Sequence, residues 1–159
     1  MPTEPITPEA VTSILDGLFG CATTANEVET PAPIAGPKVM ATYNDCDGNL
    51  QFVIACELSI ANSMGAALTM IPPGLAKEAT ANGSIPENIA ENIHEVLNIC
   101  SAAFANYHHH RIVLDQVIVP GDVADDALVA ALDAAECLIQ IDYELERYAP
   151  GKISLLKKA

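Results

Sequence analysis

The chain has 159 residues and carries 21 acidic against 7 basic side chains, which gives a formal net charge of −14 at neutral pH. Half of its residues are hydrophobic, enough to bury a core, and this argues against intrinsic disorder. Nucleic acids and anionic membrane surfaces attract proteins mainly through Lys and Arg, and this chain has no basic run. We therefore expect a folded protein whose partners include no nucleic acid and no membrane.

The five cysteines are widely spaced, and none forms a Cys-x-x-Cys pair. An odd number of scattered cysteines is typical of reduced thiols that act as small hydrophobic residues. The first eight residues lack the basic and apolar regions of a signal peptide, and no stretch approaches the length of a membrane span. These features predict a single domain, residues 1–159, in the cytoplasm.

The first predicted element is an amphipathic helix that begins after a Thr7 cap, with Pro8 in its first turn, and that extends to about Phe19. The following stretch, residues 21–37, is rich in proline and predicts a long loop or an edge strand.

Two β-type runs, residues 38–43 and 50–56, flank an Asp-Gly turn signal and predict a hairpin. Ser59 then suggests the cap of a second helix, whose apolar residues recur at helical spacing over 60–71 before a Pro-Pro pair ends it. The next segment, residues 74–83, is weakly helical at best.

The longest predicted helix follows a possible capping box at residues 84–87. Steps of three and four residues place one apolar set on a single buried face. This set consists of Ile89, Ile93, Val96, Cys100, Ala103 and Tyr107. Glu91, Glu95 and Asn98 follow the same steps but lie roughly 200° around the helix, so they should point away from the core.

The remaining segments favour strands. Residues 111–119 are expected to form a mostly buried strand that ends at Pro120, and a short helix should cover 124–132. Residues 137–145 alternate between apolar and polar side chains and should pair with a terminal strand around 153–156. About five strands and four helices with hairpin connections favour an α+β fold with a largely antiparallel sheet.

The run His108-His109-His110 has the composition of a metal site. Adjacent strand residues point to opposite faces, however, and no further ligands stand nearby in the sequence, so solvated imidazoles at a helix-to-strand junction are the favoured interpretation. A covalent Ser or Cys nucleophile is also disfavoured, because no Gly-x-Ser-x-Gly elbow or Cys/His signature is present.

The polar positions of the long helix offer a different chemistry. An outward-facing residue is usually only solvated, but asparagine is a weak helix former, so Asn98 in mid-helix suggests that its carboxamide has a task. An amide one turn from a carboxylate could position a water molecule while the carboxylate engages a cation.

The run Glu91-x3-Glu95-x2-Asn98, with Pro120 some twenty residues downstream, resembles the signature of the CheC/CheX/FliY family of chemotaxis phosphatases. The resemblance covers about residues 5–157 and includes the order of strands and helices around the motif. Family members carry Asp or Ser at the first motif position, where this chain has Glu91. This departure leaves the supporting role of Glu91 open and does not affect Glu95 or Asn98.

The resemblance implies a phosphatase in two-component signalling that hydrolyses the aspartyl-phosphate of a CheY-like response regulator. By analogy, Asn98 would orient the attacking water and Glu95 would pair with the lysine of the regulator. The Mg²⁺ would be supplied at the regulator's own site, and the chain would need no cofactor or metal of its own.

Members of the CheX type carry one motif helix per chain and form homodimers, whereas CheC-type members carry two. Asn62 occupies the corresponding place in the first half of this chain, but Ser59 stands three residues before it instead of a glutamate. This favours a CheX-like homodimer. The alternative is a catalytically silent module of the same fold that binds a receiver domain or a flagellar-switch component.

Overall fold

The structure is a computed structural model that describes residues 5–108 and 110–158, with only the backbone at Asn106 and His108. In chain order its elements are α1 (Pro8–Leu15), β1 (Thr23–Glu27), β2 (Lys38–Asn44), β3 (Leu50–Glu57), α2 (Leu58–Leu68), α3 (Pro73–Ala81), α4 (Glu87–Ile99), α5 (Ser101–His108), β4 (Val113–Ile118), α6 (Asp126–Asp133), β5 (Glu136–Leu145) and β6 (Gly151–Lys157). The strands form one sheet in the order β1-β5-β6-β3-β2-β4, and each neighbouring pair is antiparallel.

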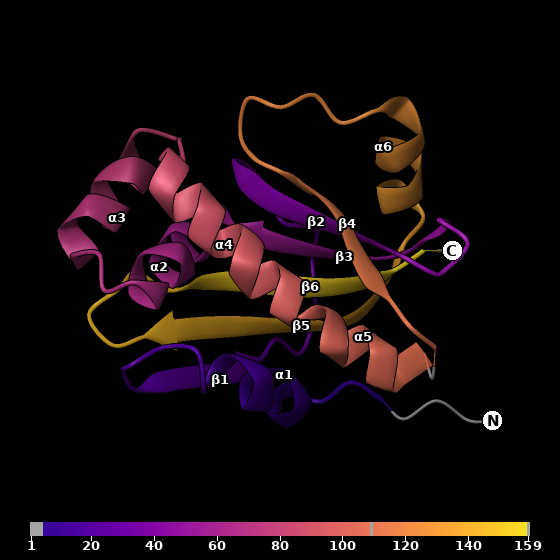
Figure 1. The fold of residues 1–159 in the computed structure, drawn as a ribbon, viewed down its shortest axis with the longest axis horizontal. Helices are drawn as coiled ribbons and strands as arrows, with labels where there is room; N and C mark the ends of the chain where they lie inside the picture. Colours follow the sequence, from indigo (N-terminus) through magenta and orange to yellow (C-terminus); the bar gives the residue numbers. More distant parts are fainter. Residues whose placement is uncertain (1–4, 109, 159) are drawn as a thin grey trace.

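The central strand β3 is buried on both faces, because helices cover one side of the sheet and a smaller layer covers the other (Figure 1). Phe52 and Ile54 point into the main core, which also contains buried residues of α1, α2, α4 and α5. Val53 points the other way and packs against Leu128 of α6. On that second face, Gln140 of β5 donates to the carbonyl of Ala32 at 2.7 Å and holds the segment between β1 and β2.

The predicted fold class is confirmed: the protein is α+β, its sheet is antiparallel, and the long helix lies on that sheet. The hairpin of β2 and β3 and the terminal pair of β5 and β6 also match the prediction. The segment after α1 was predicted to be a long loop or an edge strand. It contains a short edge strand, β1. The number of elements is higher than predicted, with six strands and six helices in the described part of the chain.

The predicted helix starts have different outcomes. Thr7 caps α1 as expected, since its hydroxyl accepts from the amide of Ala10 at 3.1 Å. The predictions that Ser59 and Ser84 cap the following helices are wrong. The helix α2 begins directly from β3 at Leu58, and the hydroxyl of Ser59 instead donates to the carbonyl of Pro150 at 2.9 Å. The helix α4 begins after Pro86 without a side-chain cap.

Three further segments differ from the prediction. The segment expected to be weakly helical forms α3, packed on α2. The long helix is interrupted at Cys100, and α5 continues it. The strand expected to be mostly buried, β4, is an edge strand that pairs only with β2, and Ile118 is its one buried residue. The apolar residues of this run do not show whether the strand lies at the edge or in the centre of the sheet, because strand order depends on the rest of the fold.

Candidate functional site

The helix α4 separates its side chains into a buried and an exposed face, as the periodicity predicts. Ile89, Ile93 and Val96 are buried against the sheet and α2. Glu91, Glu95 and Asn98 are all exposed. Residues three and four apart on a helix are neighbours, so these three side chains form a continuous polar ridge. We call this set the α4 ridge.

Two contacts fix α4 against α2 at the start of the ridge. The amide nitrogen of Asn92 donates to the carbonyl of Gly65 and to the hydroxyl of Thr69, each at 2.8 Å. Gly65 lies so close to α4 that a Cβ atom there would be 2.6 Å from the backbone oxygen and the side chain of Ile89. The position of the ridge therefore depends on a glycine and an asparagine that sequence reasoning did not single out.

A third contact holds the other end of α4. The hydroxyl of Tyr43, from β2, donates to the carbonyl of Leu97 at 2.6 Å, inside the core. Burial raises the pKa of Tyr43 well above its ordinary value, so this hydroxyl keeps its proton and remains a donor. The bond satisfies a carbonyl of the last helical turn, directly before Asn98.

The helix α2, which carries Asn62, has no comparable ridge. Asn62 of α2 is 0% exposed, and its amide nitrogen donates to the Thr80 hydroxyl at 3.0 Å and to the Ser84 carbonyl at 3.1 Å. Its side chain joins α2 to the end of α3 and the segment before α4. Because it is enclosed, Asn62 cannot reach a partner protein, and α4 carries the exposed asparagine of the motif type.

Pro120 lies in the turn after β4, where the amide of Val119 donates to the carboxylate of Asp122 at 3.1 Å. Val117 and Val119 border a shallow hollow together with Glu91 and His94 of α4. The strand that leads to Pro120 therefore lies beside the α4 ridge. His94, exposed between Glu91 and Asn98, is a feature of this site that the sequence interpretation missed.

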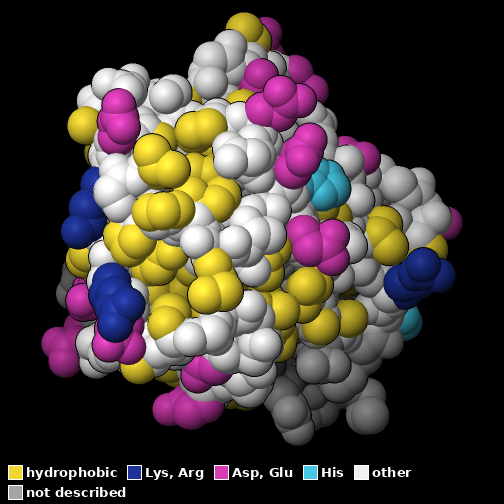
Figure 2. All heavy atoms as spheres, turned by 60° about the vertical axis from the view of Figure 1, so that its left-hand side comes forward, with side chains coloured by type: hydrophobic (Ala, Val, Ile, Leu, Met, Phe, Trp, Pro, Cys, Tyr) yellow, Lys and Arg dark blue, Asp and Glu magenta, His cyan; other side chains and the backbone are white. Residues whose placement is uncertain are grey.

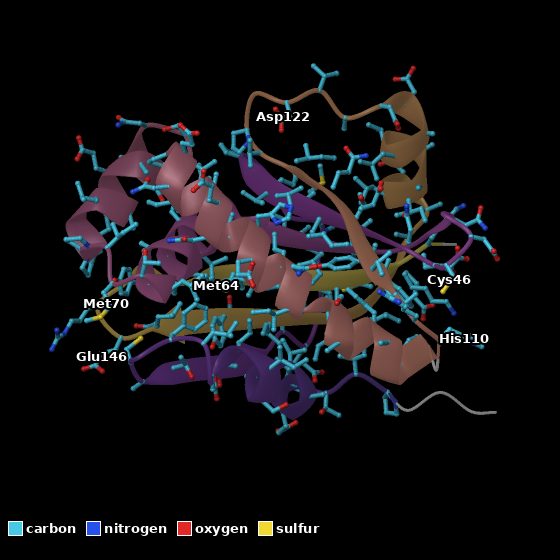
Figure 3. All side chains as sticks on the ribbon, viewed as in Figure 1. Cys46, Met64, Met70, His110, Asp122 and Glu146 are labelled. Atoms are coloured by element: carbon cyan, nitrogen blue, oxygen red, sulfur yellow. The ribbon has the colours of Figure 1, made fainter. Side chains whose placement is uncertain are left out.

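The histidine run remains outside this site. His109 and the side chain of His108 lie outside the described residues, and His110 is exposed at the same end of the molecule as Cys46 (Figure 3). The thiol of Cys46 donates to the Arg111 carbonyl at 3.9 Å. Among residues 5–108 and 110–158, no group of three or more His, Cys, Asp or Glu side chains is arranged to hold a metal ion.

All five cysteines are free thiols, as predicted. Cys56 and Cys100 are buried in the main core, and burial raises the pKa of both thiols, that of Cys100 to about 12. A thiol with so high a pKa carries almost no thiolate at neutral pH. Cys56 and Cys100 therefore act as packing residues of the core.

The acidic side chains of the α4 ridge have no basic partner within the described part of the chain, where the one ion pair joins Lys152 to Asp142. Figure 2 shows acidic side chains and a histidine close together on one side of the face that it presents, with few basic groups nearby. The carboxylates of Glu91 and Glu95 are thus available to a cation from another molecule.

No family model and no curated protein matches the sequence. Among solved structures, a chain of the CheX–CheY–BeF₃–Mg²⁺ complex from Borrelia burgdorferi is 13% identical, with a TM-score of 0.56, and the match covers 95% of this chain and 94% of that one. The chain has the CheX-type fold. A chemotactic CheC-like protein from Shewanella oneidensis matches with 9% identity, 94% coverage of each chain and a TM-score of 0.54.

A chain of the FliM–SpeE complex from H. pylori has the same fold, with 11% identity, a TM-score of 0.54, and coverage of 95% of this chain and 79% of that one. The resemblance to the CheC/CheX/FliY family is thus confirmed at the level of the fold. In the described part of the protein, no helix combines the length and the apolar character that crossing a bilayer requires.

Proposed function

We propose that this protein is a phosphatase that hydrolyses the aspartyl-phosphate of a CheY-like response regulator. The observation that carries the proposal is the joint exposure of Glu95 and Asn98 on α4, at the spacing of the motif. The fold supports it, because a chain of this fold occurs in a complex that contains CheY and Mg²⁺.

The side chains of the α4 ridge project from the surface of a helix and do not enclose a substrate. In this proposal the phosphorylated aspartate therefore lies in a cleft of the partner, and the ridge reaches into that cleft. In the proposed reaction a water oxygen attacks phosphorus, the bond between phosphorus and the aspartyl oxygen breaks, and the products are inorganic phosphate and a free aspartate carboxylate. Mg²⁺ held by the regulator would neutralise charge on the phosphoryl oxygens, and the phosphatase would add positioning.

Asn98 suits the positioning of water, because its carboxamide presents both an acceptor for a water proton and a donor. Glu95, one turn earlier, is acceptor-only when ionised and suits a salt bridge to the lysine of the regulator. Glu91 and Pro120 are supporting positions in this proposal: Glu91 extends the ridge, and Pro120 ends the strand beside it.

The experiment is to charge a CheY-like receiver with acetyl phosphate, remove the donor, and follow phosphate release with and without the protein. We expect the wild type to accelerate release and Glu95→Ala to reduce this acceleration at least tenfold, because the lysine contact orients the complex. Glu78→Ala, which removes an exposed glutamate from α3, is the matched control and should behave as the wild type. Equal decay with and without the wild-type protein would refute the proposal.

The second candidate is a silent module that binds a receiver or a flagellar-switch component. It is favoured by Glu91, which stands where the family has a smaller residue, and by the fold shared with a chain of the FliM–SpeE complex. This candidate predicts that the wild type binds the charged receiver but leaves its decay unchanged. The same phosphate-release assay, with a binding measurement beside it, separates the two functions.

We further propose that one chain presents one active ridge and acts as a homodimer. The enclosure of Asn62 supports the single-ridge form, since α2 exposes no equivalent asparagine. Light scattering on the purified protein tests the oligomeric state: a mass of twice 16.7 kDa is expected, and a mass of 16.7 kDa over the whole concentration range would exclude the dimer.

A further inference from the structure

A hollow of about 420 Å³ lies between α4 and the edge strand β4, directly beside the α4 ridge. Its walls come from two elements that are distant in the sequence. They are formed by Glu87, Ala90, Glu91, His94, Val117 and Val119. The hollow is open to solvent, and Ala90 contributes only a small side chain to its wall.

The two sides of the hollow differ in chemistry. On the β4 side, Val117 and Val119 are half-buried and pack against the main core, so they offer a firm apolar surface. On the α4 side, Glu87 and Glu91 are exposed and one helical turn apart, and neither forms an ion pair within the part of the chain that the structure describes. β4 contributes no charged side chain to the lining.

The two glutamates have different structural explanations. Glu87 lies in the first turn of α4, where the helix dipole favours a negative charge. Glu91 is one turn further in, between Glu87 and Glu95, and like charges at this spacing destabilise a helix. It also replaces the smaller residue that the CheC/CheX/FliY pattern has at this position. Glutamate is a good helix former, but the charge pattern of α4 disfavours a carboxylate at this position, and a cation bound in the hollow would relieve that repulsion.

We propose that this hollow receives a lysine or arginine side chain from the partner, as a second contact beside the one that Glu95 makes. The aliphatic stem would pack on Val117 and Val119, and the charged end would meet the carboxylates of Glu87 and Glu91. Long basic side chains bury their stems in this way while their charge stays at the rim. The proposal rests on the proposed function, because the partner is the receiver that docks on the α4 ridge.

In this proposal Glu91 contributes to the choice of partner and not to catalysis. The hollow lies to one side of Glu95 and Asn98, so a cation bound there adds to the affinity without touching the reacting group. It also adds a local attraction at the surface of a protein of net charge −14. Receivers without a basic side chain at this point of the interface should bind more weakly.

The test measures the dissociation constant of a beryllofluoride-treated CheY-like receiver for the wild type and for Glu91→Gln and Glu91→Ser. We expect both variants to bind about fivefold more weakly and with a shallower dependence on salt concentration, because one charge contact at the rim of the hollow is lost. Glu78→Gln carries the same loss of charge on α3 and should bind as the wild type. Unchanged affinity and salt dependence in both Glu91 variants would overturn the proposal.

A second pair of variants checks the apolar wall. Val117→Thr and Val119→Thr keep the shape of the side chain and add a hydroxyl, so each should weaken receiver binding about threefold while the turnover number at saturating receiver stays unchanged. If these variants lower turnover and leave affinity unchanged, the hollow does not hold the partner. If the proposed function is wrong but the receiver still docks, the wild type binds the receiver without hydrolysing its phosphate. The affinity measurements then still test whether the hollow contributes to binding.

Discussion

Asn62 of α2 and Asn98 of α4 are both helical asparagines, but they lie in opposite environments. Asn62 on α2 is enclosed and joins α2 to α3 and to the segment before α4, whereas Asn98 on α4 stands in solvent beside Glu95. One asparagine contributes to stability and the other is free to act on a partner. Residue type and local sequence alone do not separate these roles, because the difference lies in what packs on each helix.

The largest effect is expected when the contact between α2 and α4 is disturbed, because this contact encloses one face of each helix and leaves the α4 ridge exposed. Gly65→Ala would place a Cβ atom 2.6 Å from the backbone oxygen of Ile89, so α4 would have to move. We expect a loss of about 3 kcal/mol in the free energy of unfolding, measured by urea denaturation. Gly74→Ala, at a helical glycine with no atom within 4 Å of the new Cβ, should instead be neutral or slightly stabilising. Equal effects of the two substitutions would contradict the close packing of α2 and α4.

The next prediction compares the two asparagines themselves. Asn62→Ala removes two partly buried hydrogen bonds and leaves the Ser84 carbonyl without this donor. It also removes the buried Oδ1 atom, which has no hydrogen-bond partner among the described residues, so we expect a net destabilisation of about 1.5 kcal/mol. Asn98→Ala changes an exposed side chain and should shift stability by less than about 0.5 kcal/mol. Chemical denaturation of both variants measures the difference, and the reverse ranking would show that the assignment of the two roles is wrong.

A smaller effect than that of Asn62→Ala is expected at the end of α2. Met70 follows this helix with φ of 60° and is 86% exposed, and the amide of Ile71 bonds to the Ala66 carbonyl at 2.8 Å across the turn. A left-handed residue at this position is usually glycine. Met70→Gly should therefore stabilise the protein by about 1 kcal/mol, seen as a higher melting temperature. Met70→Ala is the control, since it keeps the strained backbone; an equal gain there would mean that strain is not the cause.

The periodicity of α4 was sufficient to predict its two faces from the sequence. Ile89, Ile93 and Val96 fall on one side, and the α4 ridge falls on the other, because helical geometry depends only on spacing along the chain. The α+β class followed in the same way from the alternation in β5 and the hairpin of β2 and β3. Local patterns were thus enough to predict the faces of α4, the fold class and the residues of the proposed site.

Features that depend on distant partners could not be predicted. The hydroxyl of Ser59 donates to Pro150, 91 residues away, instead of capping α2. Asn92 and Tyr43 hold α4 in place through Gly65 and Leu97, and neither stands out in the sequence. The hollow beside the ridge arises because β4 is an edge strand, which is a property of strand order and not of composition.

The most direct test of the central claim is the rate of receiver dephosphorylation by Asn98→Ala at saturating protein, with the affinity for the beryllofluoride-treated receiver measured in parallel. If Asn98 orients the attacking water, the catalysed rate should fall about a hundredfold or more while the affinity changes less than about twofold. A variant that dephosphorylates the receiver as fast as the wild type would contradict the assignment of Asn98 and, with it, the proposed mechanism.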